Sequence, residues 1–86
     1  MLPIPPPTAL IEGPPDENGI VVITGQGEPS SYVMCVNESS MSGVIEFTDD
    51  MGNYTIRIQA MSGDVLTVRH LDGGMSRELV VPEPDP

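Results

Sequence analysis

Turn-forming residues recur along this chain of 86 residues at short intervals, so the chain cannot be made of long helices from end to end. Ten Pro and nine Gly make up more than a fifth of the sequence, against an average of about 12%. Proline removes a backbone donor and fixes one backbone torsion, while glycine weakens the interior of a helix. The composition therefore favours short strands joined by many turns.

Six segments rich in β-branched and aromatic residues lie between the turn signals, at residues 20–24, 32–37, 44–48, 54–60, 64–70 and 77–81. The turn sequences between them are Gly27–Ser30, Ser39–Gly43, Asp49–Asn53, Met61–Gly63 and Leu71–Gly74. Six strands at this spacing are typical of an antiparallel sandwich or barrel. Residues 9–12 are a candidate seventh strand.

Alternation along each strand predicts which side chains face the core, because successive residues point to opposite faces. The clearest strand places Tyr54, Ile56, Ile58 and Ala60 on the inner face, with Thr55, Arg57 and Gln59 toward water. The same pattern predicts a further set of inward residues, with Glu46 exposed: Val33, Cys35, Ile45, Phe47, Leu66 and Val68. We expect a mostly aliphatic core with Phe47 and Tyr54 as its large members.

Proline-rich segments flank the strands at both ends. Residues 1–19 are predicted to be a proline-rich arm, residues 20–82 the β domain, and residues 83–86 an acidic proline-rich tail. Extended proline-rich segments suit docking along a groove. Two interpretations stay open. Either the ends are linkers, or the arm uses Leu2, Ile4, Leu10 and Ile11 to contact a neighbouring subunit or the edge of the domain.

The charge balance excludes two classes of partner. Thirteen Asp and Glu face three Arg, which gives a formal net charge of −10. Nucleic acids and anionic membrane surfaces require clustered Lys or Arg, which this chain lacks. Nothing approaches the 18 or more apolar residues of a membrane-spanning helix. The acidity leaves room for a cation or a basic partner.

No catalytic constellation is found. Asp49, Asp50 and Asn53 cluster in one turn and are candidate Ca²⁺ ligands, but such a site needs six to eight oxygens. We therefore expect an ordinary acidic hairpin there, without a cofactor. His70 has no second imidazole for a zinc site, and Cys35 lies on a predicted core face without a base. The sequence predicts a protein that is not an enzyme.

Four methionines, Met41, Met51, Met61 and Met75, fall in predicted turns. One interpretation is scattered surface or gap-filling residues. The other is that they form apolar loop tips that meet a partner.

Several phrases in the sequence form a pattern: Thr24-Gly25, Glu28-Pro29-Ser30, Val33-x-Cys35-x-Asn37, Thr48-Asp49-Asp50-x-Gly52-Asn53-Tyr54-Thr55-Ile56, Ala60-x-x-Gly63-Asp64-x-Leu66-x-Val68 and Gly73-Gly74-x-Ser76. This pattern resembles bacterial immunoglobulin-like domains of surface and secreted proteins, and it is also similar to carboxypeptidase regulatory-like domains. The resemblance covers roughly residues 20–82. It departs at Cys35, where an aliphatic residue is usual, and at Gly74, where an Asn is frequent.

The resemblance implies an immunoglobulin-like antiparallel sandwich of six to seven strands. It also implies a non-catalytic structural or protein-binding module of a bacterial extracellular or cell-surface assembly. Its partners would be protein subunits, its own copies included, without nucleic acid or membrane insertion. The alternative is a small decoration or structural protein of a virion or similar particle, whose arm docks on a neighbouring subunit. A third hypothesis is an accessory domain that positions a carbohydrate-active or proteolytic enzyme.

Overall fold

The computed structural model describes residues 5–84, and within them it contains seven β-strands and no helix. The strands are β1 (Leu10–Ile11), β2 (Ile20–Gln26), β3 (Tyr32–Asn37), β4 (Ser42–Phe47), β5 (Asn53–Gln59), β6 (Val65–His70) and β7 (Arg77–Val80). The all-β prediction is confirmed, and β1 falls within the residues proposed as a seventh strand. By length and hydropathy, residues 5–84 offer no helix that could cross a membrane.

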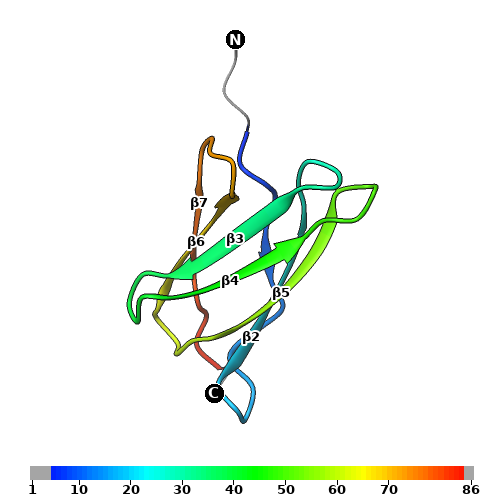
Figure 1. Ribbon diagram of the computed structural model, residues 1–86. Helices are drawn as coiled ribbons and strands as arrows, with labels where there is room; N and C mark the ends of the chain where they lie inside the picture. The colour runs from blue at the N-terminus through cyan, green and yellow to red at the C-terminus, as the bar shows by residue number, and fades with distance from the viewer. Residues whose placement is uncertain (1–4, 85–86) are drawn as a thin grey trace.

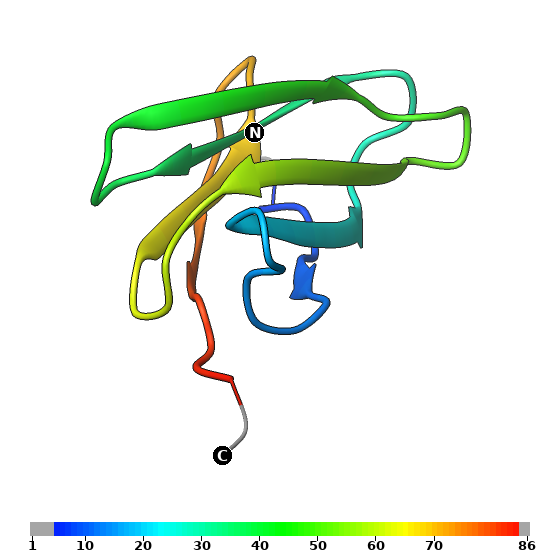
Figure 2. The same cartoon turned by 90° about the horizontal axis from the view of Figure 1, so that it is seen from below.

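The strands form two antiparallel sheets. One sheet has three strands in the order β1-β2-β5, and the other has four in the order β4-β3-β6-β7. Figure 1 shows β3 and β4 crossing in front of β2 and β5, and Figure 2 separates the layers. β4 and β5 belong to different sheets, and the segment between them leads from one sheet to the other. The prediction of a hairpin at Asp49–Asn53 is therefore wrong.

The core between the sheets is mainly aliphatic. Its buried members are Val21, Ile23, Val33, Cys35, Tyr54, Ile56, Ile58, Ala60, Leu66, Val68 and Val81. Complete burial of a Val, Leu or Ile side chain contributes about 1.5–3 kcal/mol. The inward residues predicted on β3, β5 and β6 are thus confirmed.

The facing predicted for β4 is wrong, because the strand presents its bulky residues to solvent. Ile45 is 50% exposed and Phe47 is 55% exposed, whereas Glu46 is half-buried. Glu46 lies opposite the buried Val33 of β3, and directly opposed residues share a face of the sheet. The register therefore turns Ile45 and Phe47 outward and leaves Tyr54 as the aromatic member of the core.

The segment before β1, which lies in the predicted arm, is attached to the two sheets. Pro7 is buried, and its carbonyl accepts a hydrogen bond from Nε of Arg77 at 2.9 Å. The backbone N–H of Thr8 donates to the carbonyl of Gln26 at 2.8 Å. The Tyr54 hydroxyl donates to the carbonyl of Thr8. These contacts give this segment a defined path along the end of β2.

Gly25 makes that path possible. The sequence suggested that Gly25 ends a strand, but β2 continues through it to Gln26. A Cβ at position 25 would collide with the carbonyl of Thr8 and would stand 2.7 Å from the Tyr54 hydroxyl oxygen. The glycine is therefore needed for a close approach of two segments.

Candidate protein-binding face

The outer face of the four-stranded sheet is apolar around β3 and β4. Tyr32, Met34 and Val36 alternate along β3 with the buried residues of that strand. Phe47 lies opposite Tyr32, and Ile45 lies opposite Met34. We call these five side chains, Tyr32, Met34, Val36, Ile45 and Phe47, the β3–β4 face.

An aromatic pair forms one corner of the β3–β4 face. The ring centroids of Tyr32 and Phe47 lie 4.9 Å apart, with an angle of 71° between the ring planes. This edge-to-face contact is favourable for aromatic rings, yet both side chains are more than half exposed. Leu71, whose N–H donates to the carbonyl of Tyr32 at 3.0 Å, adds a further part-exposed apolar side chain beside them.

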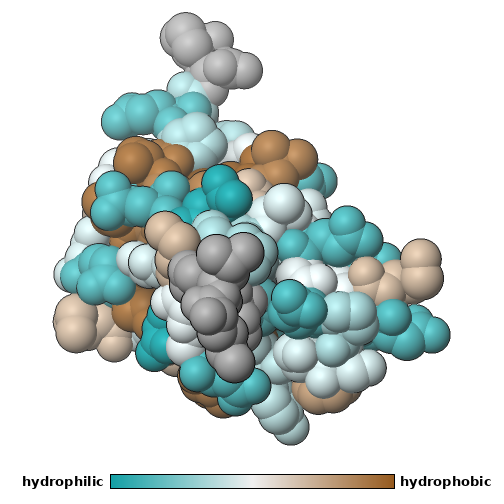
Figure 3. Space-filling view, turned by 90° about the horizontal axis from the view of Figure 1, so that it is seen from above, coloured by the Kyte–Doolittle hydropathy of each residue, from teal (hydrophilic) through white to brown (hydrophobic). Residues whose placement is uncertain are grey.

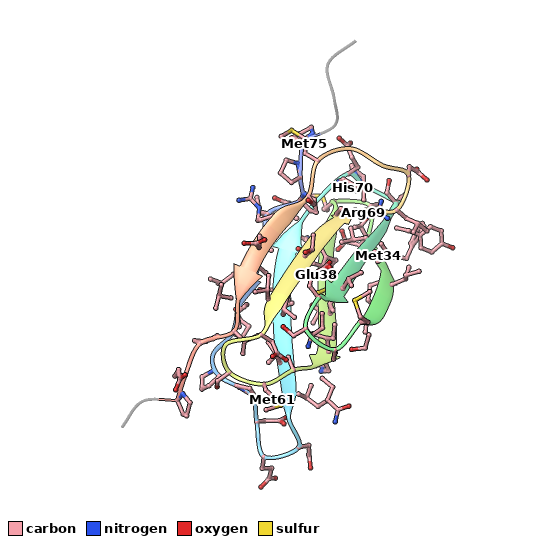
Figure 4. The ribbon with its side chains drawn as sticks, turned by 90° about the vertical axis from the view of Figure 1, so that its left-hand side faces the viewer. Met34, Glu38, Met61, Arg69, His70 and Met75 are labelled. Carbon is pink, nitrogen blue, oxygen red and sulfur yellow. The ribbon has the colours of Figure 1, made fainter. Side chains whose placement is uncertain are left out.

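The β3–β4 face borders Arg69 on β6. Arg69 is paired with Met34, and Figure 4 shows the two residues on neighbouring strands. The Arg69 guanidinium donates from Nη1 to the carbonyl of His70 at 3.4 Å. On the next strand, Glu78 lies opposite Thr67 and shares the same side of the sheet.

Two acidic loops meet at the aromatic end of the β3–β4 face, and a third begins at the same end. Ser30 N–H donates to the carbonyl of Asp49 at 2.9 Å, and the Thr48 hydroxyl donates to the carbonyl of Glu28 at 2.6 Å. Asp72 follows Leu71 in the third loop. Figure 3 looks onto this end of the molecule and shows apolar residues in brown next to hydrophilic residues in teal.

Asp49, one of the candidate Ca²⁺ ligands, is engaged by its own turn. Oδ1 of Asp49 accepts the N–H groups of Met51 at 2.9 Å and of Asn53 at 2.8 Å. The hydrogen bond from the Asn53 N–H lowers the pKa of Asp49; desolvation opposes this, and the hydrogen bond from Met51 lowers the pKa further. Asp50 is exposed on the same turn. Residues 5–84 hold no group of three or more His, Cys, Asp or Glu that could bind a metal ion.

The predicted arm residues are not gathered in one place. Leu10 is 63% exposed and lies opposite Thr24, whereas Ile11 is half-buried and packs against the core. Leu2 and Ile4 lie outside the described residues.

The exposed methionines likewise do not form one surface. Met41, Met51, Met61 and Met75 are all more than half exposed. Met61 and Met75 lie at opposite ends of the molecule in Figure 4. A common contact of all four with one small partner is therefore not favoured.

Two buried polar residues hold the ends of the sheets together. Oδ1 of Asn37 accepts the N–H of Ser39 at 2.9 Å, and Nδ2 donates to Asp64 Oδ2 at 3.0 Å. The N–H of Met61 and the Asn37 amide lower the pKa of Asp64. At the other end, Nε2 of His70 accepts the N–H of Glu28 at 3.4 Å.

Asn37 was not predicted to lie in the core. Its parity with Val33 and Cys35 was the signal that could have placed it on the inner face. His70, which lacks a second imidazole for a zinc site, is buried, with 4% of its surface exposed. It borders a hollow of about 450 Å³ that Pro6, Gln26 and Arg77 also line. Its Nδ1 has no hydrogen-bond partner among the described residues.

Cys35 is fully buried on the inner face of β3. Burial raises the pKa of its thiol to about 11. The thiolate is the reactive form of cysteine, so this side chain is held in its unreactive form at neutral pH.

Comparison with known proteins found no matching family model, no matching curated protein and no matching solved structure.

Proposed function

We propose that this protein is a non-catalytic protein-binding module and that its β3–β4 face is the binding surface. The observation that carries the proposal is the exposure of Tyr32, Ile45 and Phe47, each about half accessible to solvent on one side of one sheet. Soluble monomers rarely expose large contiguous apolar patches unless these contact another molecule. Tyr and Phe are also enriched in protein interfaces.

We also propose that the two sheets form an immunoglobulin-like sandwich. The strand order supports this, because strands one, two and five share one sheet while three, six and seven share the other. That division matches the immunoglobulin arrangement, apart from the fourth strand, which here pairs with the third. The sequence pattern of residues 20–82 supports the same assignment.

The setting we propose is a bacterial extracellular or cell-surface assembly. It rests on the resemblance of the turn and strand motifs to domains of surface and secreted proteins. The state of the two most reactive side chains, one Cys and one His, supports the absence of a catalytic role. Cys35 is buried with a raised pKa, and Nε2 of His70 is occupied by the N–H of Glu28.

Site-specific photocrosslinking in cells of the source organism tests the binding surface. We expect p-benzoylphenylalanine at position 47 to give a discrete protein adduct. The matched control places the same residue at position 55, which is exposed on the outer face of β5. Equal adducts from both positions, or none from position 47, would contradict the proposal.

The anchored base of the arm favours the second candidate, a decoration or structural protein of a virion or similar particle. Pro7 and Thr8 are held by Arg77 and Tyr54, so the base of the arm has a defined position. Removing residues 1–6 keeps Pro7 and β1, so we expect the domain to fold with an unchanged circular dichroism spectrum. If this candidate is right, the shortened chain fails to assemble on particles in sedimentation. Unchanged assembly contradicts it.

A further inference from the structure

We infer that the partner of the β3–β4 face is a basic protein segment, in which Lys or Arg alternates with apolar residues and which adds as a strand beside β4. This inference rests on the proposed function, and it specifies the chemistry and the form of the partner.

The apolar part of the partner follows from the centre of the β3–β4 face. Ile45 and Phe47 are exposed on β4, and Tyr32 packs edge-to-face on Phe47. Burying such side chains in a complex is favourable by about 25 cal/mol for each Å² of apolar surface removed from water.

The basic part follows from the carboxylates at one end of this centre. Glu28, Asp49, Asp50 and Asp72 lie on the three loops at the aromatic end, and all four are exposed. The turn amides that donate to Asp49 lower its pKa further below neutral pH. Apolar residues surrounded by charged ones are the usual anatomy of an interface. Here the surrounding charge is negative.

The net charge argues against a second copy of this chain as the occupant. Each copy carries a formal charge of −10, so association of two copies brings like charges together. Juxtaposed like charges suppress wrong partners, and a strongly charged surface speeds encounter with a partner of opposite sign. Arg69 is a single cation beside the face and does not reverse this balance.

The extended form follows from the free edge of β4. Among residues 5–84, this strand is the edge of its sheet and pairs only with β3. Thr48 N–H donates to the carbonyl of Ser31. In an antiparallel ladder hydrogen-bonded pairs alternate, so the backbone groups of Gly43, Ile45 and Phe47 point away from β3. An added strand would pair with these groups and lay alternate side chains beside Ile45 and Phe47.

Glu46 selects among strands that could use this edge. It is half-buried on the inner side of β4, between Ile45 and Phe47 in sequence. An inward-pointing charge on an edge strand discourages pairing with an ordinary apolar strand. A strand with Lys or Arg on that side neutralises the Glu46 carboxylate, so the same residue that opposes unspecific pairing favours a basic partner.

The test is a titration of ¹⁵N-labelled protein with three peptides of twelve residues. One alternates Lys with Val, the second alternates Glu with Val, and the third alternates Lys with Ser. We expect the Kd of the Lys–Val peptide to be at least about tenfold lower than that of either control. Chemical-shift changes are expected along β4 and at Tyr32, and not on β5.

Variants assign the binding to its two components. Phe47→Ser is expected to weaken Lys–Val binding about tenfold, as for an aromatic interface residue. Asp50→Asn combined with Asp72→Asn is expected to weaken it a few-fold, with a smaller salt dependence. The matched control is Glu17→Gln, an exposed carboxylate in the β1–β2 loop, which should change nothing. The ¹⁵N spectrum of each variant, recorded without peptide, shows whether that variant is folded.

Three outcomes would overturn the inference. Equal or tighter binding of the Glu–Val peptide at the β3–β4 face overturns the basic partner but leaves the proposed function intact. Sedimentation as a dimer whose interface excludes the peptide identifies a second copy as the occupant. No peptide binding, together with no adduct from position 47, overturns the inference and the proposed function together.

Discussion

The outer faces of the two sheets differ although both sheets cover the same core. In the three-stranded sheet, β5 presents Thr55, Arg57 and Gln59 to solvent, as expected for a strand with one wet face. The four-stranded sheet presents the β3–β4 face, where an aromatic pair and Ile45 take the equivalent outward positions. Folding requires only the inner sides, so this difference supports the proposal that the β3–β4 face contacts another molecule.

The difference is greatest at β4. On β5 one face is fully buried and the other is polar, whereas on β4 the inner residues Val44 and Glu46 are only half-buried. β4 therefore lies at the margin of the core. Its outward residues Ile45 and Phe47 are apolar, whereas those of β5 are polar. Its free edge is available for pairing.

The largest effect that tests this comparison is a pair of isoleucine truncations. Ile56→Ala removes a fully buried side chain and is expected to lower the free energy of unfolding by about 2–5 kcal/mol. Ile45→Ala, on the exposed face, is expected to cost less than about 1 kcal/mol. Urea denaturation measures both. Equal losses would show that the β3–β4 face is part of the core and would break the comparison.

A second prediction uses the pH dependence of stability to separate the buried core from the β3–β4 face. Burial raises the pKa of Cys35 from 9.0 to about 11 and that of Tyr54 from 10.0 to about 12. The unfolded chain therefore loses these protons first, and stability present below pH 9 falls as the pH rises toward 12. Thermal midpoints between pH 8 and 11 measure this fall. Cys35→Ala should reduce it, whereas Phe47→Ser should not alter its shape.

The smallest expected effect concerns the aromatic pair itself. A double-mutant cycle on Tyr32 and Phe47, each changed to Ala, should give a coupling energy of about 0.5–1.5 kcal/mol. The directly opposed pair Thr24 and Thr55 on the other sheet is the matched control. Its coupling is expected to be smaller. A larger value for the threonine pair would show that the aromatic contact adds nothing to the stability of this face.

Local features of the sequence predicted the strands well. The segment Tyr54–Ala60 alternates without interruption, and the structure buries the predicted side of β5. Gly52, with φ of 87°, occupies a turn where only glycine adopts the backbone easily. Such signals are carried within a few neighbouring residues, so no distant contact is needed to interpret them.

The candidate site was less accessible to prediction. Leu10 and Ile11 were singled out for their apolar character, but pairing of β1 with β2 turns one outward and the other toward the core. Tyr32 was not assigned to any surface, because its partner Phe47 was placed in the core. The β3–β4 face arises only when β3 and β4 pair in register.

The sequence by itself therefore determined that the chain is all-β, where its strands and turns lie, and that its charge is strongly negative. The tertiary structure decided which side of β4 faces outward and which loops gather around it. The physical reason is that alternation divides a strand into two faces without saying which is inner. When both faces carry apolar residues, as around Ile45, only pairing with a strand whose own inner face is buried makes that choice.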